Sequence, residues 1–159
     1  MPIRIVGWAE VAALNSGIKS DRVSVVVASF TISARRSEAA RDAAAALRAT
    51  TIAWPPPTGS WDLLVNATNV GSRAVPGMPA DITLDGRIVY DLIYDPPLTP
   101  LLEAAKAKGC TFIGGLEMLV AQAERQFEIW TGQRPPTGLF EDAAQQALAV
   151  RSYGSVGSV

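Results

Sequence analysis

The alternation of strand-like and helix-like segments constrains the fold of this chain most. Residues 23–27 form a valine-rich run, which is typical of a strand buried on both faces of a sheet. Phe30 to Ser33 continues this strand or forms a second one, and a helical pattern of alanine and leucine follows Ser37. Strands that alternate with helices in this way favour an α/β fold with a parallel sheet and helices on both faces.

The rest of the chain repeats this alternation. Further strands are predicted over residues 50–54, 62–66, 87–93 and 111–113. We expect Ser37 to be the N-cap of the first helix and Thr99 to cap the next, with Pro100 at the first helical position. A long helix is predicted from Gly115 to about Trp130, and a last one over residues 139–150.

Composition excludes several classes of function. The net charge is −1 and no basic run is present, so nucleic-acid or membrane-surface binding has no electrostatic support. The apolar runs are far shorter than the ~20 residues that a membrane span needs. Glu10 interrupts the apolar N-terminal patch, so we expect no signal peptide. A single cysteine, Cys110, excludes an internal disulfide and favours a cytoplasmic protein.

The chain contains no histidine. It therefore has no Ser-His-Asp or Cys-His nucleophile, and we expect no metal site because zinc would have only Cys110 and carboxylates as ligands. These absences favour a domain that holds a cofactor over one that transfers protons.

Ligands of parallel α/β sheets bind at the carboxyl ends of the strands. Arg35 and Arg36 follow one strand end and precede a helix, where guanidinium groups and the helix N-terminus suit a phosphate. No carboxylate stands there to bind a ribose hydroxyl, which favours NADP over NAD. The alternative is a solvated arginine pair in a loop.

Two other strand ends are candidate sites. Asn66 ends a buried strand, and the loop with Thr68 either faces a dinucleotide or uses Asn66 for an ordinary turn. Tyr94 ends another strand and could bind a hydroxylated ligand, although the pattern alone favours a half-buried ring with a wet hydroxyl.

The helix from Gly115 carries two strips. One is apolar and comprises Leu116, Leu119, Val120, Ala123, Phe127 and Trp130. The other consists of Gly115, Met118 and Gln122, at helical spacings. These three residues suit a nicotinamide beside a polyol, or pack on a second domain.

From about Thr31 to Pro136, the ordered motifs Asn66-Ala67-Thr68, Asp91-Leu92-Ile93-Tyr94 and Gly115-Leu116-Glu117-Met118 make the chain resemble the C-terminal half of shikimate dehydrogenases. This family reduces 3-dehydroshikimate to shikimate with NADPH, in the chorismate pathway to aromatic amino acids. The resemblance implies a Rossmann-like α/β sheet, mostly parallel, with helices on both faces and incomplete at its N-terminal strand.

The resemblance also implies a set of site residues. Tyr94 and Gln122 would bind the substrate, shikimate or 3-dehydroshikimate. The residues that would contact NADP are Ala34, Arg35, Arg36, Ser37, Ala39, Asn66, Thr68, Leu92, Gly115 and Met118.

Two family features have no counterpart here. The Gly-rich phosphate loop is not recognisable before Thr31, and the catalytic Lys-Asp pair belongs to an N-terminal domain that the chain does not contain. We therefore expect an atypical segment over residues 1–30, an NADP-binding domain over 31–150 and a flexible tail over 151–159. We expect no catalytic residue in this chain and negligible turnover by it alone.

Three alternatives stay open: a non-catalytic module that binds NADP or a partner protein, a fragment of a quinate/shikimate dehydrogenase paralogue, and a catalytic domain supplied by another subunit.

Overall fold

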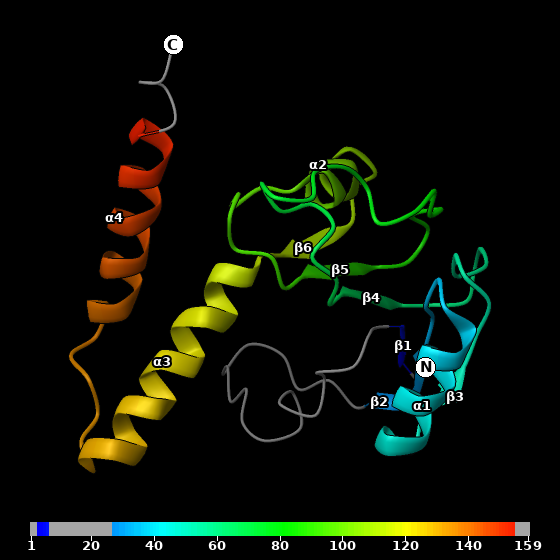
Figure 1. Cartoon of the computed structure of the whole chain (residues 1–159), viewed down its shortest axis with the longest axis horizontal. Coiled ribbons are helices and arrows are strands. Elements are labelled where there is room, and N and C mark those ends of the chain that lie inside the picture. Colours follow the sequence, from blue (N-terminus) through cyan, green and yellow to red (C-terminus); the bar gives the residue numbers. More distant parts are fainter. Residues whose placement is uncertain (1–2, 7–26, 155–159) are drawn as a thin grey trace.

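The computed structural model describes residues 3–6 and 27–154, and the side chains of residues 30–151. Its centre is a parallel six-stranded sheet with the order β3-β2-β1-β4-β5-β6 (Figure 1). The strands are β1 (Ile3–Val6), β2 (Val27–Ile32), β3 (Thr50–Thr51), β4 (Leu63–Asn66), β5 (Ile88–Asp91) and β6 (Thr111–Ile113). This order is that of dinucleotide-binding Rossmann sheets, so the predicted α/β class with a parallel, Rossmann-like sheet is confirmed.

The sequence leaves open whether the N-terminal residues contribute a strand to the sheet, and the structure shows that they do. β1 lies at the centre of the sheet and pairs in parallel with β2 on one side and β4 on the other. The predicted strand at Val23 to Val26 lies outside the described residues, as does the whole segment 7–26 that joins β1 to β2. The division of the chain into residues 1–30, 31–150 and 151–159 stays a prediction.

Helices cover both faces of the sheet (Figure 1). Helix α2 (Pro100–Ala107) buries Leu101 and Leu102 against Leu64 and Val89 on one face. Helix α1 (Ser37–Leu47) packs Ala40 and Ala44 on Ile32, and Phe30 joins this cluster to Leu63, Val65 and Tyr90. Neighbouring residues of β4 therefore belong to opposite faces, as the pleat of a strand requires.

The predicted helix caps have different outcomes. Thr99 caps α2 as predicted, because its hydroxyl accepts a hydrogen bond from the Leu102 amide at 3.3 Å and Pro100 follows it. The prediction for Ser37 is wrong. Arg36 is the N-cap of α1, since its backbone stays extended while its carbonyl already accepts the Ala40 amide at 3.1 Å. Ser37 is the first helical residue and is exposed.

Strand β3 is shorter than predicted over residues 50–54. Its ladder ends at Thr51 because that residue pairs with Ile32, the last residue of β2. Beyond it, the Ile52 amide donates to the Ile32 carbonyl at 2.9 Å, and the Ser33 hydroxyl donates to the Ala53 carbonyl at 2.7 Å. Pairing thus gives way to single hydrogen bonds ahead of Pro55.

Helices α3 (Gly115–Thr131) and α4 (Leu139–Gly154) extend away from the sheet and lie beside each other (Figure 1). The rings of Phe127 and Phe140 meet edge to face, 5.9 Å apart, and join the two helices. Gly115 is the only buried residue of α3, and Trp130, from the predicted apolar strip, is 78% exposed. Much of this helix pair therefore presents apolar surface to solvent.

Gly86 provides a test of the main core. A Cβ on Gly86 would lie 2.9 Å from Cδ2 of the buried Trp61 ring and closer still to Cε3 and Cζ3. We expect Gly86→Ala to lower the free energy of unfolding by about 1–3 kcal/mol through overpacking. Urea denaturation measures this, and Trp61→Leu/Gly86→Ala should cost less than the two single changes added together. Additive costs would contradict the contact.

Candidate dinucleotide site at the carboxyl edge of the sheet

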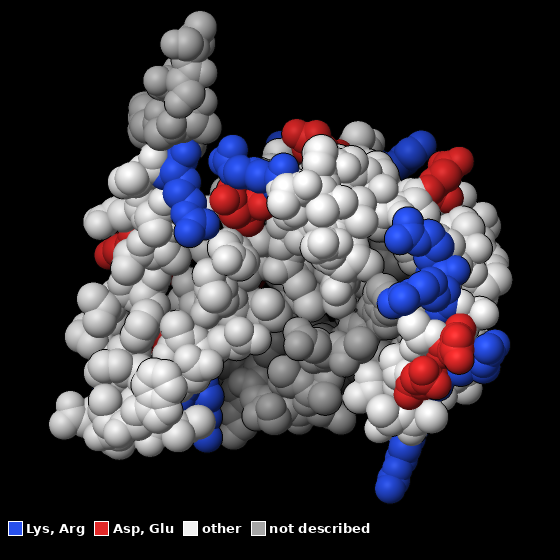
Figure 2. Space-filling model, viewed as in Figure 1, with Lys and Arg blue, Asp and Glu red and all other residues white. Residues whose placement is uncertain are grey.

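The first part of the candidate site follows β2. Arg35 and Arg36 are exposed in the bend between β2 and the N-terminus of α1. No ion pair or hydrogen bond joins either guanidinium to another described residue. Figure 2 shows basic side chains gathered over the region of α1, interleaved with acidic ones. Two free guanidiniums beside a helix N-terminus form an arrangement suited to a phosphate.

The neighbouring predicted residues differ in exposure. Ala34 is 6% exposed, and its methyl group packs in the cluster beneath α1. Ala39, in the first turn of α1, is half-buried, whereas Ser37 is exposed. Only the backbone of Ala34 is therefore free to approach a ligand. Contacts of all three with a cofactor stay predictions.

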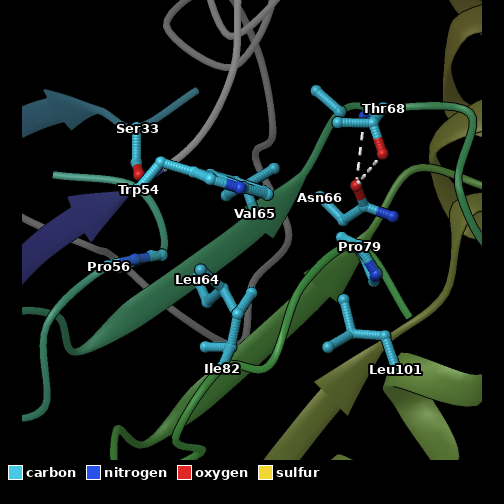
Figure 3. Close-up of a pocket in the computed structure, with 11 residues that line it drawn as sticks. Ser33, Trp54, Pro56, Leu64, Val65, Asn66, Thr68, Pro79, Ile82 and Leu101 are labelled. Carbon is cyan, nitrogen blue, oxygen red and sulfur yellow. Dashed lines mark hydrogen bonds between the residues drawn. The ribbon is translucent and has the colours of Figure 1, made fainter. Parts of the chain in front are cut away.

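A small cavity joins the ends of β2 and β4. It is lined by Ser33, Trp54, Asn66 and Thr68, among others, and has a volume of about 30 Å³. Figure 3 shows the Trp54 indole beside Ser33 and directed towards Val65 and Asn66. The cavity holds little more than a water molecule. A dinucleotide would therefore have to lie along the edge of the sheet, outside this cavity.

The loop after β4 is organised by Asn66. Its side-chain oxygen accepts hydrogen bonds from the Thr68 amide at 3.1 Å and the Thr68 hydroxyl at 2.7 Å (Figure 3). Its amide nitrogen donates to the Val70 carbonyl at 3.1 Å and to Asp91 at 3.0 Å. The structure thus shows the turn role for Asn66, and the Thr68 hydroxyl is engaged within the loop. Contact of either residue with a dinucleotide stays a prediction.

Asp91, the last residue of β5, is 0% exposed. Besides Asn66, it accepts hydrogen bonds from the Ile93 amide at 3.1 Å and the Thr99 hydroxyl at 2.6 Å. Burial raises the pKa of its carboxyl above the ordinary value, and the hydrogen bonds from Thr99, Ile93 and Asn66 only partly oppose this shift. Burial also raises the pKa of the neighbouring Tyr90 to about 12, with a contribution from Glu117.

The turn from β5 meets the start of α3 at Gly115. A Cβ on this glycine would lie 2.6 Å from the carbonyl carbon of Ile93 and closer still to that of Leu92. The Gly115 amide donates to the Ile93 carbonyl at 3.2 Å. The protein's own backbone therefore requires glycine here, whether or not a ligand also approaches. Met118 and Leu92 pack against the same small core cluster.

The two predicted substrate residues are both accessible. Tyr94 is 39% exposed just past β5, and Gln122 is exposed about two turns into α3. The structure thus brings Leu92, Gly115 and Met118 together, and it joins Asn66 and Thr68 in one network. Arg35 lies on the same edge of the sheet, because β2 runs parallel to β4 and β5.

Four residues at this edge were not predicted from the sequence as functional candidates: Ser33, Trp54, Asp91 and Thr99. Ser33 and Asp91 could have been found as polar residues at the ends of buried strands. Trp54 had no such signal, because its place over the cavity depends on the path of the chain after β3. In the part of the chain that the structure describes, no cluster of side chains could hold a metal ion, and no helix is long and apolar enough to cross a bilayer.

Comparisons with known proteins agree with this geometry. Residues 115–145 match the family described as the Shikimate 5'-dehydrogenase C-terminal domain. The shikimate dehydrogenase (NADP(+)) of Citrifermentans bemidjiense is 48% identical over 94 residues, which are 58% of this chain and 31% of that protein. Over this stretch the chain is similar to shikimate dehydrogenases.

Solved structures extend the similarity to nearly the whole chain. Shikimate 5-dehydrogenase from Thermus thermophilus, in complex with NADP(H) and shikimate, is 29% identical with a TM-score of 0.68, over 91% of this chain and 55% of that one. A ligand-free 5-ketofructose reductase from Gluconobacter is 30% identical with a TM-score of 0.68, over 92% and 56%. The chain spans about a third of the length of the curated relatives it matches and about half of these solved structures.

Gly115→Ala should change the free energy of unfolding in the direction opposite to that expected from helix propensity. Helix propensity alone would make Gly115→Ala stabilising by up to about 1 kcal/mol. The clash with the carbonyl groups of Leu92 and Ile93 should instead lower the free energy of unfolding by about 1–3 kcal/mol, because backbone cannot move aside as a side chain can. Urea denaturation measures the change.

The adjacent glycine is the matched control. A Cβ on Gly114 would stay 3.5 Å from the Pro97 carbonyl oxygen, an ordinary contact. Gly114→Ala should therefore cost about 1 kcal/mol or less, from the poorer N-cap alone. A stabilised Gly115→Ala protein would show that the turn is looser than the structure indicates.

The raised pKa of Asp91 predicts a pH dependence of stability. Its folded pKa lies above the value of about 3.9 expected in an unfolded chain. The folded state therefore binds this proton more tightly, and the contribution of Asp91 to stability falls as the pH rises through the window between the two pKa values. The difference in free energy of unfolding between the wild type and Asp91→Asn should shrink, or turn negative, from pH 4 upward. A difference that grows with pH would refute this assignment.

Proposed function

We propose that this chain is the NADP-binding half of a shikimate dehydrogenase-type oxidoreductase, an enzyme that reduces 3-dehydroshikimate to shikimate with NADPH. The observation that carries the proposal is the common edge of the sheet. Arg35 past β2, Asn66 at the end of β4 and Leu92 past β5 all lie at the carboxyl ends of parallel strands. Strands β2 and β5 are about 14 Å apart, three inter-strand spacings, and dinucleotides bind across such an edge.

The choice of NADP rests on the end of β2. The residues that follow this strand are Ser33, Ala34, Arg35 and Arg36, so no carboxylate is available for a ribose 2′-hydroxyl. Guanidinium groups match a 2′-phosphate in shape and charge. The two guanidiniums have no partner among the described residues, and so they are available to a ligand without breaking an existing ion pair. The residues present therefore fit NADP.

The chain would bind and orient the cofactor and the substrate, and NADPH, when bound, would supply the hydride. Leu92, Gly115 and Met118 would contact the nicotinamide, and Tyr94 and Gln122 would hydrogen-bond the substrate through accessible polar groups. Tyr90 lies nearby, but with a pKa of about 12 it stays protonated at neutral pH and is no general base. The catalytic Lys-Asp pair of the family would have to come from another domain.

The exposed apolar residues of α3 and α4 support the need for such a domain. Ile129 is 64% exposed, Leu139 48% and Val150 72%, alongside Trp130. Apolar surface of this kind marks an interaction site. The matched solved structures are also nearly twice as long as the part that this chain spans. We infer that the second half of the enzyme, in the same or a separate chain, covers this helix pair, and that the complete enzyme works in the cytoplasm.

A second candidate is a non-catalytic module that binds NADP or a partner through the same surfaces. It is favoured by the absence of histidine from the chain, which leaves fewer groups for proton transfer. The likeness to a 5-ketofructose reductase keeps the substrate open as well, since that protein, by its name, acts on a different ketone. Shikimate, quinate and other hydroxylated compounds would be told apart by Tyr94, Gln122 and the second domain.

The cofactor assignment is tested at Arg35. We expect Arg35→Ala to weaken NADP binding by tenfold or more, because charge-assisted hydrogen bonds contribute about 1.5–3 kcal/mol. NAD, which lacks the 2′-phosphate, should bind both proteins equally. Titration with tryptophan fluorescence measures both affinities, since Trp54 lies at this edge.

Arg48→Asn is the matched control. It removes one positive charge from the opposite end of α1, where Arg48 is the C-cap and has a left-handed backbone that asparagine tolerates. It should leave NADP affinity within a factor of about two, since exposed charges beyond a Debye length are screened. Equal losses in the two variants would point to a general charge effect, and no loss in Arg35→Ala would refute the 2′-phosphate site.

Turnover separates the two candidate functions. We expect the isolated chain to bind NADP but to oxidise shikimate at a rate indistinguishable from buffer, as measured by NADPH absorbance. Co-expression with a polypeptide carrying the family's N-terminal domain should restore activity and bury the α3–α4 surface. Robust activity of the isolated chain would overturn the need for a second domain, and a bound but inactive complex would favour the non-catalytic module.

A further inference from the structure

The ends of β4 and β5 share a buried polar network whose centre has no assigned role. The buried polar or charged side chains in the described part of the chain are Ser33, Asn66, Asp91 and Thr99. The last three of these are joined by hydrogen bonds. Asp91 lies between the other two and is the only one of them that can carry a charge.

The Asp91 carboxylate is the acceptor in each of its hydrogen bonds with the described residues. One oxygen accepts from the side-chain amide of Asn66 and the backbone amide of Ile93, and the other accepts from the Thr99 hydroxyl. Among the described residues, no lysine or arginine forms an ion pair with it. A carboxylate suits this position because it is acceptor-only, whereas an amide side chain would present hydrogens to one of these donors.

The cost of this arrangement argues that it does more than fill space. Burying a carboxylate costs several kcal/mol unless its hydrogen bonds compensate, and an apolar side chain would avoid that cost. A fully satisfied buried network can fix one arrangement of the chain among several. The hydrogen-bond partners of Asp91 indicate which segments of the chain it holds in place.

Those partners belong to two loops that the proposed function places against NADP. Asn66 holds the loop after β4 through Thr68 and Val70. The Ile93 amide belongs to the turn after β5, and the carbonyl of the same residue accepts the Gly115 amide at the start of α3.

The two loops also lie close together. A Cβ on Gly71 would lie 3.3 Å from Cδ1 of Ile93 and 3.5 Å from Cβ of Thr99. Asn66 and the Ile93 amide both hydrogen-bond Asp91, so a shift of either loop relative to the other would strain these hydrogen bonds.

We propose that Asp91 is a positioning residue of the dinucleotide site, which acts through Asn66, Thr99 and the Ile93 amide to hold the loops after β4 and β5 as one rigid unit. This inference rests on the proposed function, and it adds a residue that itself touches neither cofactor nor substrate. The unit presents the backbone of Leu92 and the start of α3 to the nicotinamide half of the cofactor. The adenosine half, held by Arg35 beyond β2, does not depend on it.

The test uses two probes that differ only in the half of the site they need. NADP requires both halves, whereas adenosine 2′,5′-bisphosphate has the adenosine and its 2′-phosphate but no nicotinamide. In Asp91→Asn, the amide hydrogens would face Thr99 and deprive its hydroxyl of an acceptor. We expect NADP to bind about tenfold more weakly and the bisphosphate to bind within about twofold of the wild type.

Two further variants locate the effect. Thr99→Ser keeps the hydroxyl and should retain the affinity of the wild type for NADP, whereas Thr99→Val should weaken NADP binding as Asp91→Asn does. Ser33→Ala is the matched control, because it removes a buried hydrogen bond, to the Ala53 carbonyl, from the other side of the site. It should leave the ratio of NADP to bisphosphate affinity unchanged.

Hydrogen exchange of the ligand-free chain gives a readout that does not need the cofactor. We expect Asp91→Asn to speed exchange at the amides of Thr68 and Val70, which hydrogen-bond within the other loop, as well as at Ile93. The Ile52 amide, bonded to the Ile32 carbonyl, should keep its protection. Faster exchange confined to Ile93 would show that the loops move separately and would overturn the proposal.

The outcomes distinguish this proposal from the one on which it rests. Selective loss of NADP affinity together with coupled exchange supports the positioning role. Equal loss of NADP and bisphosphate affinity, or no loss, overturns it. If the wild-type chain binds neither probe, the proposed function fails, and the exchange of Thr68 and Val70 still decides whether Asp91 couples the two loops.

Discussion

The parallel pairing of six strands is the constraint on which the rest of this structure depends. Because β1 pairs with both β2 and β4 in the same direction, the order of the strands reverses at the centre of the sheet and every carboxyl end lies on one edge. This edge therefore brings together the arginines, the polar loop and the glycine turn, which are far apart in the sequence. A hydrogen-bonding pattern of the backbone thus decides where any ligand site must be.

Along that edge, the two ends of the candidate site differ in how their polar side chains are held. Near β2 it leaves charged side chains free in solvent, where they are available to a ligand. Near β4 and β5 it does the opposite: it turns Asn66, Thr68 and Thr99 inward and satisfies them with one another and with Asp91. One side of the site is thus poised to form new interactions, while the other already holds its geometry.

Residues whose role depends on local chemistry could be predicted from the sequence. The Thr99-Pro100 start of α2, the glycine at the start of α3 and the arginine pair after a strand all follow from rules that span a few residues. Ser37 was a wrong choice of N-cap because serine, arginine and their neighbours offer several places to begin the first turn, and packing of Ala40 and Ala44 selects among them. Asp91 was visible only as part of a motif, since its partners are contributed by three separate segments.

The sequence by itself determined the class of the fold and predicted the kind of ligand that we propose. Strand and helix periodicities are local properties, and the absence of histidine and the presence of Arg35 need no coordinates. Tertiary structure alone decided that β1 occupies the centre of the sheet, that Gly115 is required by the carbonyl groups of Leu92 and Ile93, and that Asp91 is buried among three donors. The reason is physical: strand pairing, close approach and desolvation depend on what surrounds a residue in space. Those surroundings come from separate parts of the chain, and the local sequence of one part does not indicate which other parts it will meet.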